Sequence, residues 1–200
     1  MSDRSDVAII DSGGANLASL QFALDRLGAH SIVSADYATI ACAARVLLPG
    51  VGAAGDAMRQ LRATGLDRLI PNLRVPVLGI CLGMQLLFEH CSEGDTTGLG
   101  ILPGRVERLL GAPDLPVPHM GWNTLEPIGR DPLMSGIEPG SYVYFVHSYA
   151  AGLSDCTLAS VQYGGAHAAV VRRDNFHGVQ FHPERSAAVG ARLLNNFLAR

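Results

Sequence analysis

A cysteine lies between two glycines in the segment LGICLGMQ, where an apolar run gives way to a helical pattern. Residues 75–80 are continuously apolar, which is typical of a parallel strand covered on both faces, and a helix is expected over 84–90. A Gly-x-Cys-x-Gly turn between strand and helix is the thiol counterpart of the nucleophile elbow. The helix N-terminus would favour the thiolate of Cys81, which is the attacking species. A buried cysteine whose glycines allow close strand–helix packing fits equally well, so both interpretations stay open.

The segment FHPE supplies the groups that a thiol nucleophile needs, and it follows the apolar run HGVQF. Such a nucleophile requires a base, and the base requires an acceptor on its other ring nitrogen. Residues two apart in an extended segment point to the same side, so Glu184 can reach the imidazole of His182. Pro183 keeps the segment extended. A solvent-exposed turn is the alternative, but the position at the end of a predicted strand, at the same sheet edge as Cys81, favours catalysis.

A glycine-rich turn, LPGVGAAG at residues 48–55, follows another predicted strand. A tetrahedral acyl intermediate needs backbone N–H donors near its oxyanion, and glycine lets the backbone approach closely or adopt unusual φ values. Gly50 and Gly52 meet this need, and the N–H of Leu82, directly after the nucleophile, is the expected companion donor. An ordinary strand–helix loop is the alternative. A phosphate cradle is not favoured, because no Lys-Ser/Thr pair follows the glycines.

These candidate groups require elements that bring several strand ends together. The first half of the chain alternates apolar, β-rich runs with stretches of helical periodicity. This alternation predicts an α/β protein with an open, doubly wound sheet and a functional site at the carboxyl ends of its strands. The expected strands are 7–11, 30–34, 45–50 and 75–80, and the expected helices are 16–27 (capped by Asn16), 38–44 and 56–68.

The second half of the chain has a different pattern. Residues 100–126 are rich in Gly and Pro. The segments that follow are typical of antiparallel strands, so the sheet is expected to be mixed. No linker or internal repeat is visible, and residues 1–200 are interpreted as a single domain. The expected later elements are strands at 141–150, 157–163, 168–173 and 177–181, and a closing helix at 187–199.

Composition narrows the classes of function. Forty-eight per cent of the 200 residues are apolar, which is enough for a hydrophobic core. The 15 basic and 18 acidic side chains give a net charge of −3, so nothing favours nucleic acid or an anionic membrane as a partner. No signal peptide or membrane-spanning run is visible. The four cysteines form no CxxC pair and are expected to be reduced thiols, not zinc ligands, in a soluble cytoplasmic protein.

Three motifs, GICLGMQ, VQFHPE and LPGVG, together resemble the class I (triad-type) glutamine amidotransferases over nearly the whole chain. The resemblance implies the flavodoxin-like fold of that family, with glutamine as the substrate. It implies no cofactor and no metal. By position it makes Cys81 the nucleophile, His182 the acid and base, and Glu184 the carboxylate that orients the imidazole. It also implies that the substrate and its oxyanion are held by Gly50, Val51, Gly52, Leu82 and Gln85.

Two further segments indicate which branch of the family the chain resembles. They are PHMGWN at 118–123, which is expected to be a surface loop, and YFVHSY at 144–149. Both are similar to the glutaminase subunits of imidazole glycerol phosphate synthase. In those proteins the first segment faces the synthase partner, and the His-Ser-Tyr backbone helps to bind glutamine. A core position for Trp122 and structural roles for the histidines are the alternatives. The implied partner contacts are Asn16, His119, Met120, Trp122 and Asn123, and the implied glutamine contacts are His147, Ser148 and Tyr149.

The N-terminal motif departs from the family pattern. The relatives usually have Asp-Tyr-Gly-x-Gly-Asn-Leu, whereas residues 11–17 are DSGGANL. Tyr is replaced by Ser12 and the second Gly by Ala15, while Asn16 is retained. His-Pro-Glu is followed by Arg185 where Lys is usual, which keeps the charge.

The length of the chain leaves no room for a fused synthase domain. The resemblance therefore implies a separate (β/α)8-barrel cyclase, which forms a heterodimer with this chain and receives the ammonia to make imidazole glycerol phosphate and AICAR in histidine biosynthesis. One alternative is the glutaminase of another synthase, such as pyridoxal phosphate synthase, against which PHMGWN and HSY argue. Another is a catalytically silent regulatory module, against which the intact Cys-His-Glu set argues.

Overall fold

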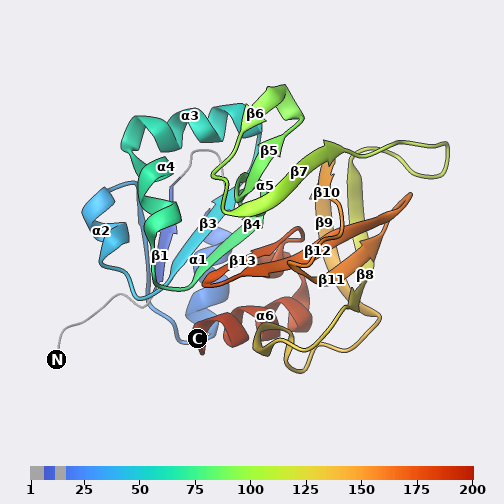
Figure 1. The fold of residues 1–200 in the computed structure, drawn as a ribbon. Helices are drawn as coiled ribbons and strands as arrows, with labels where there is room; N and C mark the ends of the chain where they lie inside the picture. Colours follow the sequence, from blue (N-terminus) through green and yellow to red (C-terminus); the bar gives the residue numbers. More distant parts are fainter. Residues whose placement is uncertain (1–6, 12–16) are drawn as a thin grey trace.

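A nine-stranded mixed sheet crosses the middle of the fold (Figure 1), in a computed structural model that describes residues 7–11 and 17–200. Its order is β2-β1-β3-β4-β13-β12-β11-β8-β9. The strands from β2 to β13 are parallel, in the 2-1-3-4-5 order of flavodoxin-like sheets, and the rest are antiparallel. The predicted doubly wound, mixed sheet is confirmed. The strands are β1 (Val7–Ile10), β2 (Ser31–Ser34), β3 (Val46–Gly50), β4 (Val77–Cys81), β8 (His119–Pro127), β9 (Ser141–His147), β11 (Thr157–Gln162), β12 (Ala166–Arg173) and β13 (Phe176–Val179).

A second sheet of four strands has the order β10-β7-β5-β6. It lies beside the ends of β3 and β4, next to helix α5 (Figure 1). Its strands are β5 (Phe88–Cys91), β6 (Thr96–Thr97), β7 (Leu102–Arg108) and β10 (Tyr149–Ala151). The helices are α1 (Leu17–Arg26), α2 (Tyr37–Ala41), α3 (Ala54–Thr64), α4 (Leu66–Leu69), α5 (Leu82–Leu86) and α6 (Ala187–Leu198), with short 3-10 turns η1 (Ile70–Asn72), η2 (Glu93–Asp95), η3 (Pro132–Met134) and η4 (Pro183–Arg185).

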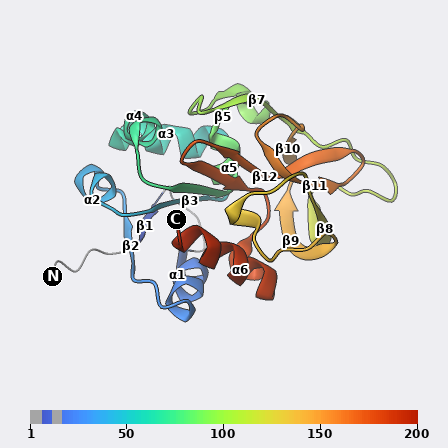
Figure 2. The same cartoon turned by 60° about the horizontal axis from the view of Figure 1, so that its bottom comes forward.

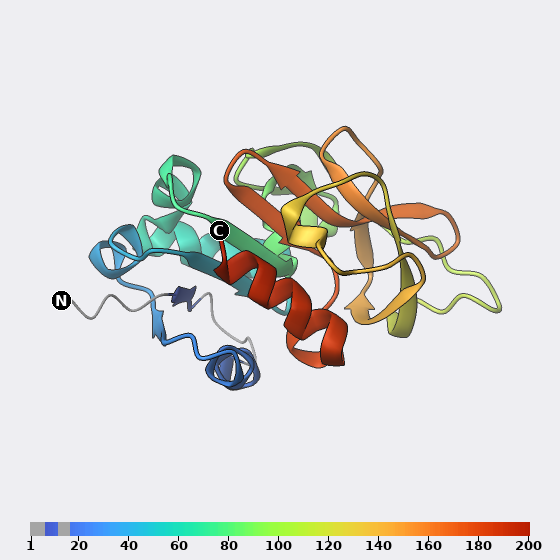
Figure 3. The same cartoon turned by 90° about the horizontal axis from the view of Figure 1, so that it is seen from below.

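Helices cover both faces of the parallel strands. Alternate residues of β1 contribute to opposite hydrophobic clusters: Ala8 and Ile10 join one, and Val7 and Ile9 join the other. Helices α2, α3, α4 and α5 pack into the first cluster, and α1 and α6 into the second. Figure 2 and Figure 3 show α1 (blue) and α6 (red) on the face opposite α3. Burial on both faces explains why the parallel strands are continuously apolar in sequence.

One predicted helix is wrong at its end. The helix expected over 84–90 ends at Leu86, and Phe88 begins strand β5. This strand pairs with β7, and Gly98 packs so closely on it that a Cβ there would lie 2.1 Å from the Phe88 carbonyl oxygen. Phe88 is 2% exposed, and such burial is equally compatible with a core helix and with a strand. The pattern of apolar residues therefore could not distinguish a helix from a strand at this position.

The sequence predicted no strand in the Gly- and Pro-rich region 100–126, and it predicted a surface loop at 118–123. The region instead contains β7 and most of β8, and the segment 118–123, expected to be a loop, follows a cis Val117–Pro118 bond and becomes strand. Strand β9 supplies hydrogen-bonding partners for residues 119–125, which overrides the weak strand propensity of the segment. Asn16 and the departures at Ser12 and Ala15 lie outside the described residues. Within residues 7–11 and 17–200, no helix is long and apolar enough to cross a membrane.

Candidate active site

Three neighbouring parallel strands, β3, β4 and β13, end at one edge of the central sheet. Gly50 at the end of β3 pairs directly with Cys81 at the end of β4. His182 follows shortly after the end of β13. Cys81 and His182 both line a cavity of about 300 Å³ at this edge, a volume within the range of small-molecule sites. The structure therefore brings the three segments that the sequence singled out to one place.

The backbone at Cys81 is strained, with φ 55° and ψ −112°. Close packing around the turn holds it in that conformation. A Cβ on Gly83 would lie 1.7 Å from the Leu48 carbonyl oxygen, and one on Gly79 would lie 2.6 Å from the Gly83 oxygen. Only glycine permits these approaches between β3, β4 and α5. The turn thus fits both interpretations of the Gly-x-Cys-x-Gly pattern, the nucleophile elbow and the close strand–helix packing. The close packing is what holds Cys81 in its strained conformation.

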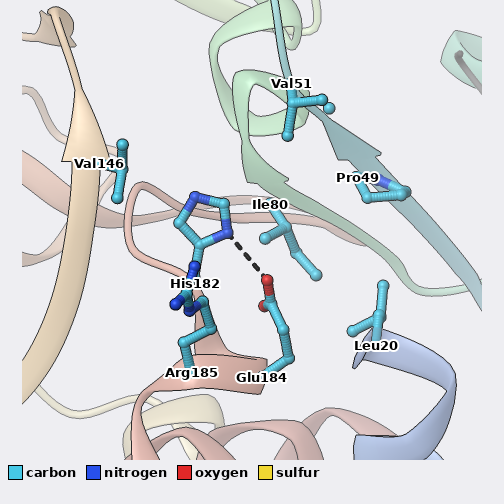
Figure 4. Close-up of a pocket in the computed structure, with 9 residues that line it drawn as sticks. Leu20, Pro49, Val51, Ile80, Val146, His182, Glu184 and Arg185 are labelled. Atoms are coloured by element: carbon cyan, nitrogen blue, oxygen red, sulfur yellow. Dashed lines mark hydrogen bonds and ion pairs between the residues drawn. The ribbon is translucent and has the colours of Figure 1, made fainter. Parts of the chain in front are cut away.

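His182 and Glu184 form the expected hydrogen bond (Figure 4), but the extended segment predicted for them is wrong, because residues Pro183–Arg185 form the 3-10 turn η4. The Nδ1 atom of His182 lies 2.9 Å from Oε1 of Glu184, and both side chains are largely buried. The backbone is anchored as well, since the His182 N–H donates to the Tyr144 carbonyl and the His182 carbonyl accepts from the Ser186 hydroxyl. Burial opposes a charged imidazole, but hydrogen bonds and charge from Cys81 and Glu184 raise the pKa of His182 to about 10.

A second cavity, of about 200 Å³, lies on the Glu184 side of the imidazole. Figure 4 shows Leu20, Pro49 and Ile80 around it, so much of its wall is apolar. Val146 and His182 line both cavities, which places the imidazole between them. Glu184 thus holds the Nδ1 atom of His182, and the Nε2 atom is left for proton transfer.

The glycine turn after β3 lies beside Cys81, because Gly50 pairs with it and Val51 and Gly52 line the same cavity. Gly52 has φ +86° and open space around its missing Cβ, as expected for a turn that needs glycine. For Gly50 the reason is different: a Cβ there would lie 3.0 Å from the Leu82 Cβ, so it is required for space and not for its φ. Leu82 is the first residue of α5, and N–H groups at that position have no acceptor within the helix.

Glu93 is a cavity residue that the sequence did not single out. Its Oε2 accepts a 2.8 Å hydrogen bond from the Ala54 N–H, at the start of α3 directly after the glycine turn. Glu93 also lines the cavity that contains Cys81. No motif marks it, because η2 reaches the cavity only through the packing of the second sheet. A carboxylate is thereby added to the site.

Two buried glutamines connect the cavity wall to the sulfur. Gln85 Nε2 donates to the Tyr149 carbonyl at 2.8 Å and to Gln180 Oε1 at 3.0 Å. Gln180 is fully buried, and its Nε2 lies 3.9 Å from Cys81 Sγ. The sulfur also lies 3.5 Å from the Val146 carbonyl oxygen. Gln180 was not predicted, although it stands inside the quoted motif VQFHPE.

His147, Ser148 and Tyr149 of the HSY segment all line the cavity that contains Cys81. His147 is 6% exposed, and its Nδ1 atom lies 2.8 Å from the Tyr149 carbonyl oxygen. Burial lowers the pKa of His147 to about 4, so the ring is neutral at physiological pH.

Strand β8 separates the predicted partner residues into two sets, because successive side chains of a strand point to opposite faces. Met120 (67% exposed) and Trp122 (52% exposed) point outward. His119 is only 4% exposed, and Asn123 turns to the same inner side and lies 3.4 Å from it. The interface assignment of His119 is therefore corrected: its ring is buried, stacked between Phe145 and Tyr163.

Known proteins share both sequence and fold with this chain. Residues 8–200 match the family described as glutamine amidotransferase class-I. Imidazole glycerol phosphate synthase subunit HisH of Xylella fastidiosa strain Temecula1 is 52% identical over 194 residues, which covers 97% of each chain. The protein of the same name from Shewanella oneidensis is 52% identical over 213 residues, covering 98% of this chain and 96% of its own.

Solved structures agree at lower identity. A glutamine amidotransferase structure aligns with a TM-score of 0.75 at 20% identity, over 97% of each chain. A glutamine amidotransferase from Thermotoga maritima aligns with a TM-score of 0.64 at 17% identity, covering 93% of this chain and 79% of that one. At these identities the likeness concerns the fold, and it confirms the predicted fold class.

Proposed function

Because this chain belongs to the class-I glutamine amidotransferase family, we propose that it is the glutaminase subunit of an imidazole glycerol phosphate synthase. It hydrolyses glutamine to glutamate and ammonia, and the ammonia passes to a partner that makes imidazole glycerol phosphate and AICAR in histidine biosynthesis. One observation carries the proposal. The strained Cys81 and His182, whose Nδ1 atom Glu184 holds, line one cavity of about 300 Å³, in a chain 52% identical over 97% of its length to subunits of that name.

The reaction begins with attack of the Cys81 thiolate on the side-chain amide carbon of glutamine. N–H groups of residues 50–52 and of Leu82 stabilise the oxyanion. The His182 imidazolium, which its high pKa keeps protonated at neutral pH, gives the Nε2 proton to the leaving nitrogen, and ammonia departs from a thioester. Neutral His182 then takes a proton from water, which attacks the thioester and releases glutamate. Glu184 holds Nδ1 throughout, so Nε2 exchanges the protons.

Recognition of the amino-acid end of glutamine is assigned to the cavity wall. Both N–H donors of Gln85 are already used by Tyr149 and Gln180, so its Oε1 acceptor remains for the substrate. Glu93 offers a carboxylate to the α-ammonium group. The backbone of residues 147–149 completes the wall. No cofactor takes part in this scheme.

The partner in this proposal is a (β/α)8-barrel cyclase, bound as a heterodimer in the cytoplasm, and residues 1–200 act as one domain. The outward face of β8 and β9 supports this docking site, because Met120, Trp122 and Tyr142 are exposed there. The inner face of the same two strands carries His147, which lines the cavity with Cys81, so a partner on the outward face binds close to the cavity. Ammonia then has a short way to the next site.

The test is glutamate and ammonia release by the purified chain, measured with and without the cyclase. We expect slow hydrolysis by the isolated chain and much faster hydrolysis in the complex, because losing one aligned oxyanion donor costs about 100-fold or more in rate. The glycine turn at 50–52 is the element whose alignment depends on the partner. Equal rates with and without the cyclase would contradict activation by the partner. Activation by an unrelated synthase alone would show that the assigned partner is wrong.

A further inference from the structure

We propose that His119 is a positioning residue for glutamine hydrolysis. Through His147 it fixes the Tyr149 carbonyl, and through that carbonyl it fixes the side chains of Gln85 and Gln180, whose last N–H group faces Cys81. This series of hydrogen bonds is called the relay below. This inference takes its substrate, glutamine, from the proposed function, whereas the hydrogen-bond geometry on which it is built is independent of that function. His119 does not line the cavity; it acts entirely through its neighbours.

A continuous series of hydrogen bonds runs from strand β8 to the sulfur. Asn123 Nδ2 lies 3.4 Å from His119 Nε2, and His119 Nδ1 lies 3.0 Å from His147 Nε2. His147 Nδ1 reaches the Tyr149 carbonyl at 2.8 Å. From that carbonyl the series continues through Gln85 and Gln180 to Cys81, as described above. The imidazoles and both glutamine side chains in it are buried.

The Tyr149 carbonyl sets the direction of every bond in the series, because a carbonyl oxygen can only accept. The group of Gln85 that faces it must be the NH₂, so Gln85 also donates to Gln180, and Gln180 must turn its own NH₂ toward the sulfur. The relay therefore presents the Nε2–H group of Gln180 to the sulfur of Cys81, and a hydrogen-bond donor at this position stabilises the thiolate.

The same carbonyl fixes the histidine tautomers. His147 must carry its proton on Nδ1, so its Nε2 accepts from Nδ1–H of His119, and His119 Nε2 accepts from Asn123. Asn123 has no alternative orientation, since its Oδ1 accepts from the Thr124 N–H and its Nδ2 donates to the Gln162 carbonyl. A proton added to either imidazole would set two donors against each other.

The surroundings keep both rings neutral. Burial lowers the pKa of His119 and of His147 to about 4, and positive charge on neighbouring histidines acts in the same direction. The titratable groups that act on the pair are His167 on β12 and His182 beyond β13, and no acidic group contributes among the described residues. The aromatic rings of Phe145 and Tyr163 cover the two faces of His119.

The position of His119 also links the relay to the partner face. His119 and Asn123 occupy the inner side of β8, and Met120 and Trp122 occupy the outer side of the same five-residue stretch. A partner that presses on the outer side acts on the backbone that carries Asn123 and His119, the outer end of the relay. The relay is thus a physical connection from the docking strand to the nucleophile.

The test compares His119→Leu with His119→Asn in the chain bound to its cyclase. Leucine removes the bond to His147, and we expect KM for glutamine to rise about tenfold or more, since a buried acceptor is left without a donor. The asparagine amide stands where Nδ1 was, so it should restore KM to within about threefold of the wild type. The acid limb of the kcat/KM profile should move to higher pH in His119→Leu, because protonated His147 then meets no opposing donor.

The control is His177→Leu, which removes another buried imidazole that is not part of the relay. It should lower the melting temperature and leave KM and the acid limb unchanged. If His119→Leu does not fold, Asn123→Ala shortens the relay at its outer end and should raise KM about two- to fivefold. Hydrolysis by the wild type with KM and acid limb unchanged in the folded variants overturns the relay. Absence of hydrolysis by the wild type overturns the proposed function instead, and the tautomers measured by ¹⁵N NMR of the imidazoles then decide the relay.

Discussion

The parallel and antiparallel halves of the central sheet contribute to the candidate site in different ways. The parallel strands β3 and β4 place Gly50 and Cys81 by steric packing, with glycines at contacts that admit no Cβ. The antiparallel strands β8 and β9 place polar groups, such as His119 and His147, by directional hydrogen bonds, and His182 likewise donates its N–H to the Tyr144 carbonyl on β9. The nucleophile is thus fixed by shape in one half, and the histidines and recognition groups are fixed by hydrogen-bond direction in the other.

The largest effect is expected from the nucleophile of the parallel half. Cys81→Ala should lower glutamine hydrolysis by about 10⁴-fold or more, because no other group can form the thioester. The measurement is glutamate release with the cyclase present. Cys42→Ala removes an exposed free thiol and serves as the control, with an unchanged rate. Residual hydrolysis near the wild-type rate in Cys81→Ala would remove the triad from the proposal.

Steric placement in the parallel half is tested by Gly83→Ala. The new Cβ would lie 1.7 Å from the Leu48 carbonyl oxygen, so the free energy of unfolding should fall by about 3 kcal/mol or more, or folding should fail. Gly28→Ala is the matched control: it has φ +74° in open space and should cost only about 1 kcal/mol. Denaturant unfolding measures both, and equal losses would contradict the steric argument.

The charge in the parallel half is tested by Glu184→Gln. Glu184 helps to raise the pKa of His182 to about 10, so wild-type activity should decline only as pH rises through about 10. In the variant the imidazolium loses its proton at lower pH, and the alkaline limb of kcat should shift toward neutrality. The rate itself should fall about 100-fold or more, since a wrong imidazole tautomer then becomes accessible. An unmoved alkaline limb would show that Glu184 does not hold the proton.

The outer face of the antiparallel half is tested by Trp122→Ala. Trp122 is half exposed and makes an edge contact with Tyr144, so little stability should be lost. Affinity for the cyclase should fall by about 2 kcal/mol, or about 30-fold in Kd. Titration calorimetry measures it, and Leu110→Ala, at an exposed leucine elsewhere, is the control. Unchanged affinity would move the docking site away from β8.

The smallest effect concerns the pH dependence of stability. His119 and His147 in the antiparallel half, and His177 on β13, have folded pKa values of about 4, below the usual 6.5, so their contribution to stability is full above pH 6.5 and is lost as pH falls from 6.5 toward 4. His182 behaves oppositely: its contribution is full below pH 6.5 and is lost as pH rises through about 10. Melting temperatures should therefore fall modestly on both sides of neutrality. His182→Gln should remove part of the alkaline decline only.

The sequence predicted the parallel half well because its signals are local. Continuous apolar runs mark strands buried on both faces, and the cysteine turn and the His-Pro-Glu segment are short enough to be recognised without neighbours. It predicted the antiparallel half poorly between residues 100 and 126. There, Gly and Pro obscure the period of two, and the strand forms because β9 lies alongside it.

By itself the sequence determined the mixed α/β architecture and the family likeness, and it identified the three segments around Cys81, His182 and the glycine turn. Only the tertiary structure decided that Glu93 lines the cavity, that Gln180 contacts the Cys81 sulfur, and that His119 points inward while Trp122 points outward. The reason is physical. Periodicity and motifs are properties of neighbours in the chain, whereas the direction of a hydrogen bond between Gln85 and Tyr149, 64 residues apart, exists only after the two sheets have packed together.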